Sequence, residues 1–354
     1  MHLTGPTDRV PSPIDIPGPW RKSAEAILFN RWRKVLVLGA TDTGKSTYCR
    51  VLAERLQSAG MTVSFVDADV GQKDVGPPAT ITTARLEGDA ELAQAGPAGW
   101  FFVGDVNPVR QLLAMVVGTR KLVDTATGDF VVIDSPGLVE GPGRVFNTYQ
   151  IESLRPEVIV AIQRGNELEP TLHACFHQPI LRLRPSRQAV RKSIQARRQS
   201  REQAFRTYFA NGRIVVLDLQ RLAVQRAPLF TGVLLDDPRF IYAERMPEGI
   251  VAIGESPARP EHGMRVLPAD FADHLLCGVL DAQGDCVGLG ILDRIDFRQR
   301  QLHLFTPVTR SHIHGLQFGS LHLEPNGHQL AHLHLPHGAR TRKAGGVASD
   351  GEVR

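Results

Sequence analysis

The chain has 354 residues, of which 42% are hydrophobic and 22% charged, so it can form packed cores and is not a disordered protein. Its formal charge of +4 is small for this length, so affinity for a polyanion has to come from local basic clusters. The absence of a long apolar run and of an apolar signal core predicts a cytoplasmic protein without membrane contact. The four cysteines form no CxxC pair, which favours free, reduced thiols.

The first half of the chain alternates short apolar runs with helical patterns. Residues 1–33 predict an irregular lead-in that ends in a short helix from Trp20 to Arg33. The apolar runs suit strands buried on both faces of a parallel sheet, and they occupy residues 35–38, 63–66, 100–103, 130–133, 158–162 and 214–217. Strands that alternate with helices indicate an α/β domain with a doubly wound, mainly parallel sheet, which we place at residues 34–225.

The composition changes twice towards the C-terminus. Residues 184–206 hold eight Lys or Arg among 23 residues and one acid, Glu202, which predicts one long basic helix. Residues 226–335 carry short β-like runs with Gly and Asp at the turns, which predicts a small β-rich C-terminal domain. Residues 336–354 are predicted to form a disordered tail.

A glycine-rich segment after the first apolar run fits the pattern GxxxxGK[ST] of a phosphate-binding loop (P-loop). An apolar strand precedes it and an amphipathic helix follows, which predicts a P-loop NTPase. In such a loop, backbone N–H groups and the helix N-terminus bind phosphates, the Lys reaches the β- and γ-phosphates, and the Ser ligates Mg²⁺. The predicted ATP-binding residues are Gly39, Ala40, Thr41, Asp42, Thr43, Gly44, Lys45, Ser46 and Thr47.

Acidic residues stand at the ends of two predicted strands. Asp67 and Asp69 alternate after residues 63–66, so we expect both carboxylates to point towards the ligand crevice at the strand ends. One of them would hold Mg²⁺ and the other would accept a proton from an attacking hydroxyl. Asp134 begins an Asp-Ser-Pro-Gly turn that resembles γ-phosphate sensors, and no NKxD-like guanine-reading motif follows it.

Together these motifs resemble the polynucleotide 5′-hydroxyl kinases, which include RNA kinases of mRNA 3′-end and pre-rRNA processing and their archaeal and bacterial relatives. The resemblance rests on three segments, Asp67-Ala68-Asp69-Val70-Gly71-Gln72, Pro77-Pro78-Ala79-Thr80-Ile81 and Phe102-Val103-Gly104-Asp105-Val106-Asn107-Pro108. Leu154-Arg155-Pro156 and Tyr208-Phe209 fit as well. The resemblance covers residues 20–219 well and the C-terminal domain more loosely.

The resemblance implies transfer of the γ-phosphoryl group of ATP to the 5′-hydroxyl of RNA or DNA, with ATP and Mg²⁺ as cofactors. Asp69 would be the general base, and the arginines would form a lid over the phosphates. The expected catalytic residues are Lys45, Asp69, Gln72, Arg197, Arg198 and Arg201. The expected metal ligands are Ser46, Asp67 and Asp69, and the expected substrate-binding residues are Pro78, Thr80 and Asp134.

Two positions depart from the family pattern. The segment that closes over the substrate usually reads Pro-Gly-Thr, and here Ala79 replaces the glycine. A Cβ at this place is expected to narrow the approach of the backbone to the substrate. Leu138 stands where family members often carry a tryptophan that can stack on a base, so base gripping is expected to be weaker.

Two other functions fit parts of the pattern. A non-catalytic ATP-binding scaffold of an RNA-processing complex would bind ATP without turnover, and the intact Lys45, Asp69 and Gln72 argue against it. A P-loop ATPase switch would use the turn after Asp134, but it needs no arginine-rich lid. The sequence does not separate RNA from DNA, and it identifies no protein partner and no adenine-binding residue.

Overall fold

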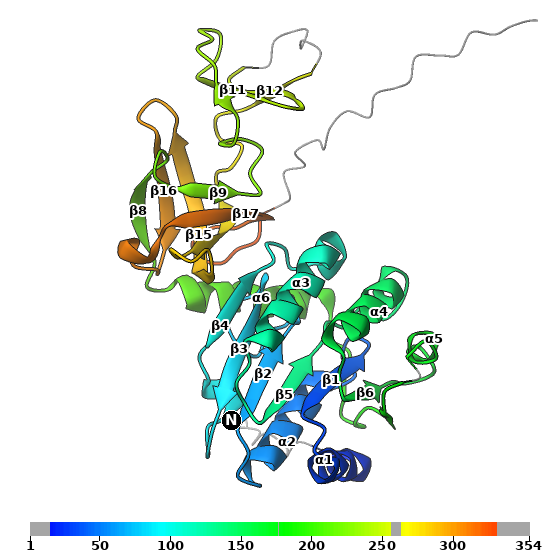
Figure 1. The fold of residues 1–354 in the computed structure, drawn as a ribbon. Helices are drawn as coiled ribbons and strands as arrows, with labels where there is room; N and C mark the ends of the chain where they lie inside the picture. Colours follow the sequence, from blue (N-terminus) through cyan, green and yellow to red (C-terminus); the bar gives the residue numbers. More distant parts are fainter. Residues whose placement is uncertain (1–14, 176, 256–262, 331–354) are drawn as a thin grey trace, which may run out of the picture.

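The computed structural model describes residues 15–175, 177–255 and 263–330, which form two connected bodies (Figure 1). One body is a layered α/β domain, and the other consists mainly of β-strands. The helix α6 (Ile194–Phe209) lies where the two bodies meet.

A seven-stranded sheet forms the middle layer of the α/β domain, in the order β4-β3-β2-β5-β1-β6-β7. The five strands β2, β5, β1, β6 and β7 run parallel, β3 is antiparallel to β2, and the edge strand β4 is antiparallel to β3. The predicted doubly wound, mainly parallel sheet is thus confirmed. The strands are β1 (Lys34–Gly39), β2 (Val63–Asp67), β3 (Thr80–Leu86), β4 (Gly99–Phe102), β5 (Phe130–Asp134), β6 (Val158–Ile162) and β7 (Ile180–Leu183).

Helices cover both faces of this sheet, which explains why its central strands are apolar throughout rather than alternating. On one face, α1 (Gly18–Asn30) and α2 (Lys45–Gln57) pack through a core that includes Trp20 and Tyr48. On the other face lie α3 (Leu112–Asp124), α4 (Pro142–Leu154) and the short α5 (Glu169–Leu172). The predicted N-terminal helix is α1, which begins two residues and ends three residues earlier than predicted.

Two sheets make up the β-rich body, as predicted for the C-terminal part of the chain. The larger has the order β8-β16-β15-β14-β17-β9, and the smaller has the order β10-β11-β12-β13. The strands are β8 (Arg213–Asp218), β9 (Ala223–Gln225), β10 (Val233–Leu234), β11 (Tyr242–Met246), β12 (Gly249–Ile253), β13 (Met264–Leu267), β14 (Leu275–Leu280), β15 (Cys286–Asp296), β16 (Gln301–Thr306) and β17 (Gly315–His322).

The predicted boundary between residues 225 and 226 falls inside the larger of these sheets and is therefore wrong. β8 pairs antiparallel with β16, and β9 pairs parallel with β17, so both strands belong to the β-rich body. The apolar run at 214–217 is a strand, but its pattern alone does not say which sheet it joins. The structural boundary lies at the end of α6, near Ala210.

The predicted long basic helix is shorter and begins later than expected. Residues 184–193 form a loop, and α6 starts after Ser193, whose hydroxyl accepts a hydrogen bond from the N–H of Ala196 (3.0 Å). Pro185 explains part of the difference, because proline disfavours helical geometry in the residue before it and lacks a donor N–H. The predicted disordered tail (336–354) lies outside the described residues.

A shared apolar cluster joins the two bodies. Phe205 and Phe209 of α6 pack there with Phe102 at the end of β4 and with Leu276 of β14. The backbones also approach closely, because the N–H of Ser320 donates to the carbonyl of Gly104 (2.9 Å).

Three glycines make this close approach possible. A Cβ on Gly104, whose φ is 91°, would lie 2.9 Å from the Cα of Gly319. A Cβ on Gly319 would lie 2.8 Å from the Gly104 carbonyl oxygen, and one on Gly278 would lie 2.5 Å from Phe102. Side chains at these positions would therefore separate the two bodies.

The state of the cysteines and the length of the helices test two expectations that came from composition. Cys49, Cys175, Cys277 and Cys286 are free and buried, as predicted. Within the three described ranges, the helices are too short or too polar to cross a bilayer.

Candidate active site

The P-loop lies between β1 and α2, where the sequence placed it. Gly39 has no room for a side chain, because a Cβ there would lie 2.6 Å from the Thr43 hydroxyl and 2.7 Å from the Ile162 carbonyl. Gly44 adopts a φ of 90°, which favours glycine. Lys45 is buried at the start of α2, and its Nζ donates to the Ala40 carbonyl (3.1 Å). The loop can therefore present backbone N–H groups and an ammonium group to the same space.

A cavity of about 400 Å³ opens in front of the P-loop. Its floor includes Gly44 to Thr47, and Asp69, Gln72 and Lys73 line one side. The loop that precedes α6 forms another wall, with Ser186, Gln188, Ala189, Val190 and Lys192. The cavity thus has a phosphate-binding floor and a carboxylate on its side, as phosphoryl transfer requires.

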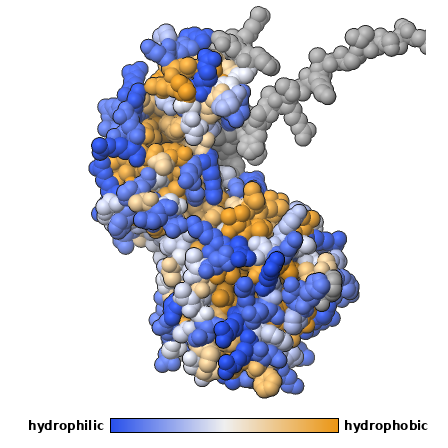
Figure 2. Space-filling model, in the orientation of Figure 1, coloured by the Kyte–Doolittle hydropathy of each residue, from blue (hydrophilic) through white to orange (hydrophobic). Residues whose placement is uncertain are grey.

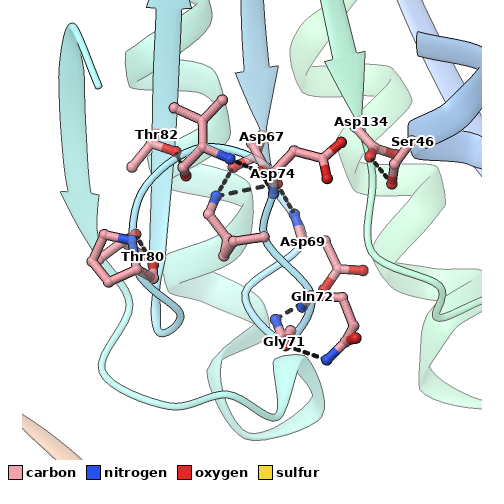
Figure 3. Close-up of polar contacts among 12 residues, drawn as sticks. Ser46, Asp67, Asp69, Gly71, Gln72, Asp74, Thr80, Thr82 and Asp134 are labelled. Atoms are coloured by element: carbon pink, nitrogen blue, oxygen red, sulfur yellow. Dashed lines mark hydrogen bonds and ion pairs between the residues drawn. The ribbon is translucent and has the colours of Figure 1, made fainter. Parts of the chain in front are cut away.

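Asp134, at the end of β5, contacts the P-loop helix directly (Figure 3). Its Oδ2 accepts a hydrogen bond from the Ser46 hydroxyl (2.5 Å), and its Oδ1 is buried without a hydrogen-bond partner among the described residues. Burial raises the pKa of Asp134 to about 8, although nearby Lys45 opposes this shift. A buried carboxylate oxygen without a partner beside a serine hydroxyl fits a divalent cation. The sequence had assigned Asp134 to substrate binding and missed this pairing.

Asp67, the last residue of β2, does not take the position expected for a metal ligand. Its Oδ2 accepts hydrogen bonds from the N–H groups of Asp74 (2.7 Å) and Val75 (3.0 Å). Its Oδ1 lies 3.1 Å from the Nζ of Lys73 and accepts the N–H of Asp69. Both oxygens are thus occupied by the loop that follows β2. Asp67 and Asp69 do not point the same way, because the strand ends at Asp67 and the chain turns.

Asp69 lines the cavity from this loop (Figure 3). Its Oδ1 accepts hydrogen bonds from the N–H groups of Gly71 (2.8 Å) and Gln72 (3.0 Å), which fix the orientation of the carboxylate. No hydrogen bond to Oδ2 is found within the described part of the chain. The side-chain amide of Gln72 donates to the carbonyls of Gly71 (2.8 Å) and Arg197 (3.3 Å), so the same loop is tied to α6.

The three predicted lid arginines have different surroundings. Arg197 reaches the P-loop, where its Nη2 lies 2.5 Å from the Oδ2 of Asp42. Arg201 is half-buried near Asp69, its Nε has no partner among the described residues, and burial lowers the pKa of its guanidinium group. Arg198 instead contacts Glu202 (2.9 Å) and the Gln329 carbonyl (3.0 Å), so it faces the β-rich body. We therefore remove Arg198 from the candidate catalytic residues.

The segment around Ala79 forms a buried turn rather than an open wall of the cavity. Pro78 and Thr80 are buried and do not line the cavity, and the Thr80 hydroxyl donates to the Pro77 carbonyl (2.7 Å). Ala79 has a φ of 64°, a left-handed conformation that explains why the family pattern has glycine here. Its carbonyl accepts the N–H groups of Val103 and Gly104 (both 3.0 Å). In this arrangement neither Pro78 nor Thr80 is placed to touch a substrate.

Two charged residues organise the site in ways that the sequence did not indicate: Asp42, which was predicted only to bind ATP, and Lys73, which had no predicted role. Asp42 accepts hydrogen bonds from Arg197 and from the N–H of Lys192 (3.0 Å), and so connects the P-loop to the segment before α6. Lys73 is buried against Asp67. Asp42 lies inside the P-loop and Lys73 directly follows the Asp67–Gln72 segment, but only the fold shows their partners. Within the described residues, no group of three or more His, Cys, Asp or Glu side chains is arranged as a metal site.

The fold and this site define a P-loop NTPase, in which the loop between β1 and α2 faces a carboxylate at the carboxyl edge of the sheet. Residues 39–211 match the family model described as the P-loop of mRNA cleavage and polyadenylation factor CLP1. The chain belongs to this family.

The chain is similar to known proteins over most of its length. It is 31% identical over 343 residues to a polyribonucleotide 5′-hydroxyl-kinase of Pyrococcus furiosus, across 90% of this chain and 96% of the relative. It is 33% identical over 319 residues to a polyribonucleotide 5′-hydroxyl-kinase of Pyrococcus horikoshii, across 84% of this chain and 88% of the relative. The structure of a Clp1p–Pcf11p complex has the same fold, with a TM-score of 0.59 over 86% of this chain and 78% of that chain, at 11% identity.

Proposed function

We propose that this protein is an ATP-dependent polyribonucleotide 5′-hydroxyl kinase. The observation that carries the proposal is the cavity in which the Asp69 carboxylate lies beside the P-loop residues Lys45 and Ser46. The names of the archaeal relatives support RNA as the acceptor. DNA remains an acceptor to be measured, because the 2′-hydroxyl contacts that separate the two depend on details of the pocket.

The cavity suggests how ATP lies in the site. The triphosphate would lie on the P-loop, with its charge met by backbone N–H groups, Lys45 and the N-terminus of α2. The base would extend towards the wall formed by Ser186, Gln188 and Ala189. Trp20 also lines the cavity, but its ring is fully buried and its Nε1 donates to the Arg184 carbonyl (2.9 Å), so it supports this wall rather than stacking on the base.

The residues beside the P-loop fit a Mg²⁺ ion. Ser46 and Asp134 would hold it directly or through water, and Asp67 is left out because its oxygens are occupied. A bound Mg²⁺ supplies charge neutralisation for the phosphate oxygens. The raised pKa of Asp134 agrees with a carboxyl group whose natural counter-charge is a cation.

The side chains of the cavity can carry the transfer itself. The oxygen of the 5′-hydroxyl forms the new bond to the γ-phosphorus, the bond from that phosphorus to the bridging oxygen breaks, and ADP leaves. The hydroxyl proton passes to the Oδ2 of Asp69, whose Oδ1 is held by two backbone N–H groups. Arg201 and Arg197 would stabilise the charge that spreads over the transferring oxygens. For Arg197 this requires release from Asp42.

A scaffold without turnover is the second candidate, because one solved structure of the same fold, at 11% identity, is a complex with a protein partner, Pcf11p. A scaffold would bind ATP and a protein without producing a phosphorylated oligonucleotide. A protein-stimulated ATPase would release phosphate, again without such a product. Product analysis therefore separates all three functions.

The test uses labelled ATP with matched 5′-hydroxyl RNA and DNA oligonucleotides. We expect label on the 5′ end of RNA, and we expect Lys45→Ala and Asp69→Asn to lower kcat by about 100-fold or more. Asp89→Asn, at an exposed acid outside the cavity, is the matched control and should keep full activity. If the Asp69→Asn variant keeps full activity, Asp69 is not the general base. If the wild-type protein gives no labelled product, the kinase proposal is overturned.

A further inference from the structure

A second cavity, of about 470 Å³, lies on the β-rich body. We call it the arginine pocket, and it is lined by residues 216–218 of β8, Gln220, residues 298–300 of the β15–β16 turn, Gln301 of β16, and Arg310. Hydrophilic side chains dominate the outer edge of this body, on the left in Figure 2. Neither the proposed transfer nor the family's P-loop segment uses this surface.

The arginine pocket has an excess of cationic side chains. Arg298, Arg300 and Arg310 are exposed, and none of them forms an ion pair or a side-chain hydrogen bond with the described residues. Asp218 is the acid in the lining, and its Oδ1 is occupied by the N–H of Gln220 (2.9 Å). Many other arginines of the chain have carboxylate partners, such as Arg50 with Asp74 and Arg182 with Glu169. Three guanidinium groups around one cavity, without a charged or hydrogen-bonding partner in the part of the chain that the structure describes, favour an anionic ligand.

The shape and chemistry of the arginine pocket favour a phosphodiester backbone over a nucleotide. Within the described ranges, no aromatic side chain lines it, so it offers no platform on which a base could stack. The three arginines come from two separate segments, and β8, the edge strand of its sheet, forms part of the lining. Such an arrangement suits successive phosphates of one strand and carries no base specificity.

We propose that the arginine pocket binds phosphates of the RNA substrate at a distance from the 5′ end that reacts. This inference rests on the proposed kinase function, because it extends the path of the same substrate. The ligand class is single-stranded polyribonucleotide, held by its backbone.

The chain connects the two sites directly. α6 carries Arg197 and Arg201 near the first cavity, and β8 follows α6 after a short turn. α6 has 16 residues and is about 24 Å long, and the two cavities share no lining residue. We therefore expect a very short oligonucleotide to fill the first cavity without reaching the arginine pocket. The side of α6 that faces solvent includes Gln195, Gln199 and Gln203. It thus presents no negative charge to a strand running from one site to the other.

The experiment compares substrates of two lengths. We would measure KM and kcat with 5′-hydroxyl RNA of about 4 and about 25 nucleotides, for the wild type and for the triple variant Arg298→Gln, Arg300→Gln and Arg310→Gln. We expect KM for the long RNA to rise about 10-fold while kcat and the short substrate are unchanged. In fluorescence anisotropy, the salt dependence of long-RNA binding should fall by about 2 in its logarithmic slope, since each lost phosphate contact removes about 0.7.

A matched control removes three exposed arginines elsewhere, by Arg144→Gln, Arg155→Gln and Arg245→Gln. If this control weakens long-RNA binding as much as the triple variant does, the effect is one of overall charge and the proposal falls. It also falls if the triple variant binds long RNA like the wild type. A poly-glutamate peptide is the second probe: if the triple variant loses only the binding of this peptide, the β8 edge binds an acidic protein and the proposal falls. Because anisotropy needs no turnover, RNA binding that depends on these arginines would support the pocket even in a protein without kinase activity.

Discussion

Two aspartates show how different the roles of equivalent strand-end acids can be. Asp67 and Asp134 lie opposite each other in the register of β2 and β5. Asp67 accepts hydrogen bonds from backbone N–H groups and contacts Lys73, so the protein itself supplies partners for both of its oxygens. Asp134 has one serine hydroxyl and an unpartnered oxygen, so its charge is left for a ligand to balance.

This difference predicts a pH-dependent stability that depends on Asp134. Its pKa rises from 3.8 to about 8 on folding, so the protonated form is favoured in the folded state. The stability linked to this proton is present below about pH 4 and is lost as pH rises towards about 8. In EDTA, the free energy of unfolding of the wild type should therefore fall between about pH 5 and about pH 8.5, relative to Asp134→Asn.

Mg²⁺ provides the complementary measurement in the same urea titrations. It should stabilise the wild type more at the higher pH, where the carboxyl group is ionised, and should have little effect on Asp134→Asn. Equal stabilisation of both proteins by Mg²⁺ would place the ion elsewhere.

Single residues were predictable where their role depends on local sequence. The P-loop residues from Gly39 to Thr47 have their expected positions because glycine spacing and the following helix fix the loop. Asp69 was found because a motif marks it. The partners of Asp67 and Arg198 were not predictable. Those of Asp67 come from the turn of the loop after β2, and Arg198 contacts Gln329, which belongs to the other body.

At the scale of elements, α6 shows that a run of basic residues does not by itself define the bounds of a helix. The basic composition is continuous from residue 184 to 206, but only its second half is helical. The first half is a loop held by tertiary contacts, including the hydrogen bond from the Lys192 N–H to Asp42, and Arg197 of α6 donates to the same carboxylate. Arg197 thus lies in the first turn of α6, where the helix is most easily frayed.

We expect the cap of α6 to affect both stability and catalysis. Ser193→Ala removes the acceptor for the Ala196 N–H and should lower the free energy of unfolding by about 1 kcal/mol. It should also lower kcat, because a frayed first turn no longer holds Arg197. Ser193→Asn can cap the helix as well as serine and serves as the control. Urea unfolding and oligonucleotide phosphorylation measure both effects, and wild-type behaviour of Ser193→Ala would exclude this role.

At the scale of the whole molecule, the two bodies form one packed unit. The sequence predicted both fold classes correctly but placed their boundary inside the larger C-terminal sheet. Apolar runs reveal that a strand is buried, whereas the choice of its neighbours depends on contacts between distant segments. The cluster around Phe102, Phe205 and Leu276 could not be predicted for the same reason.

This joint core predicts that the two bodies unfold together. Differential scanning calorimetry should show one transition, because separating the bodies would expose the cluster that both share. Gly278→Ala should shift this transition to lower temperature as a whole, since its Cβ would overlap Phe102, at a cost of about 1–3 kcal/mol. Gly96→Ala is the control, because a Cβ there meets open space and the residue has an ordinary φ. Gly284 also faces open space, but its positive φ makes it unsuitable. Two separate transitions would contradict the prediction.

The glycine contacts at this joint also limit how the protein can diverge. Gly104, Gly278 and Gly319 face each other or Phe102 at distances that exclude any side chain. A lineage that replaced one of them would have to move a backbone in the opposite half, so neither half can evolve its surface there independently. The ATP-binding part and its β-rich companion are therefore inherited as a matched pair, and recombination between distant relatives would have to exchange both sides of the contact at once.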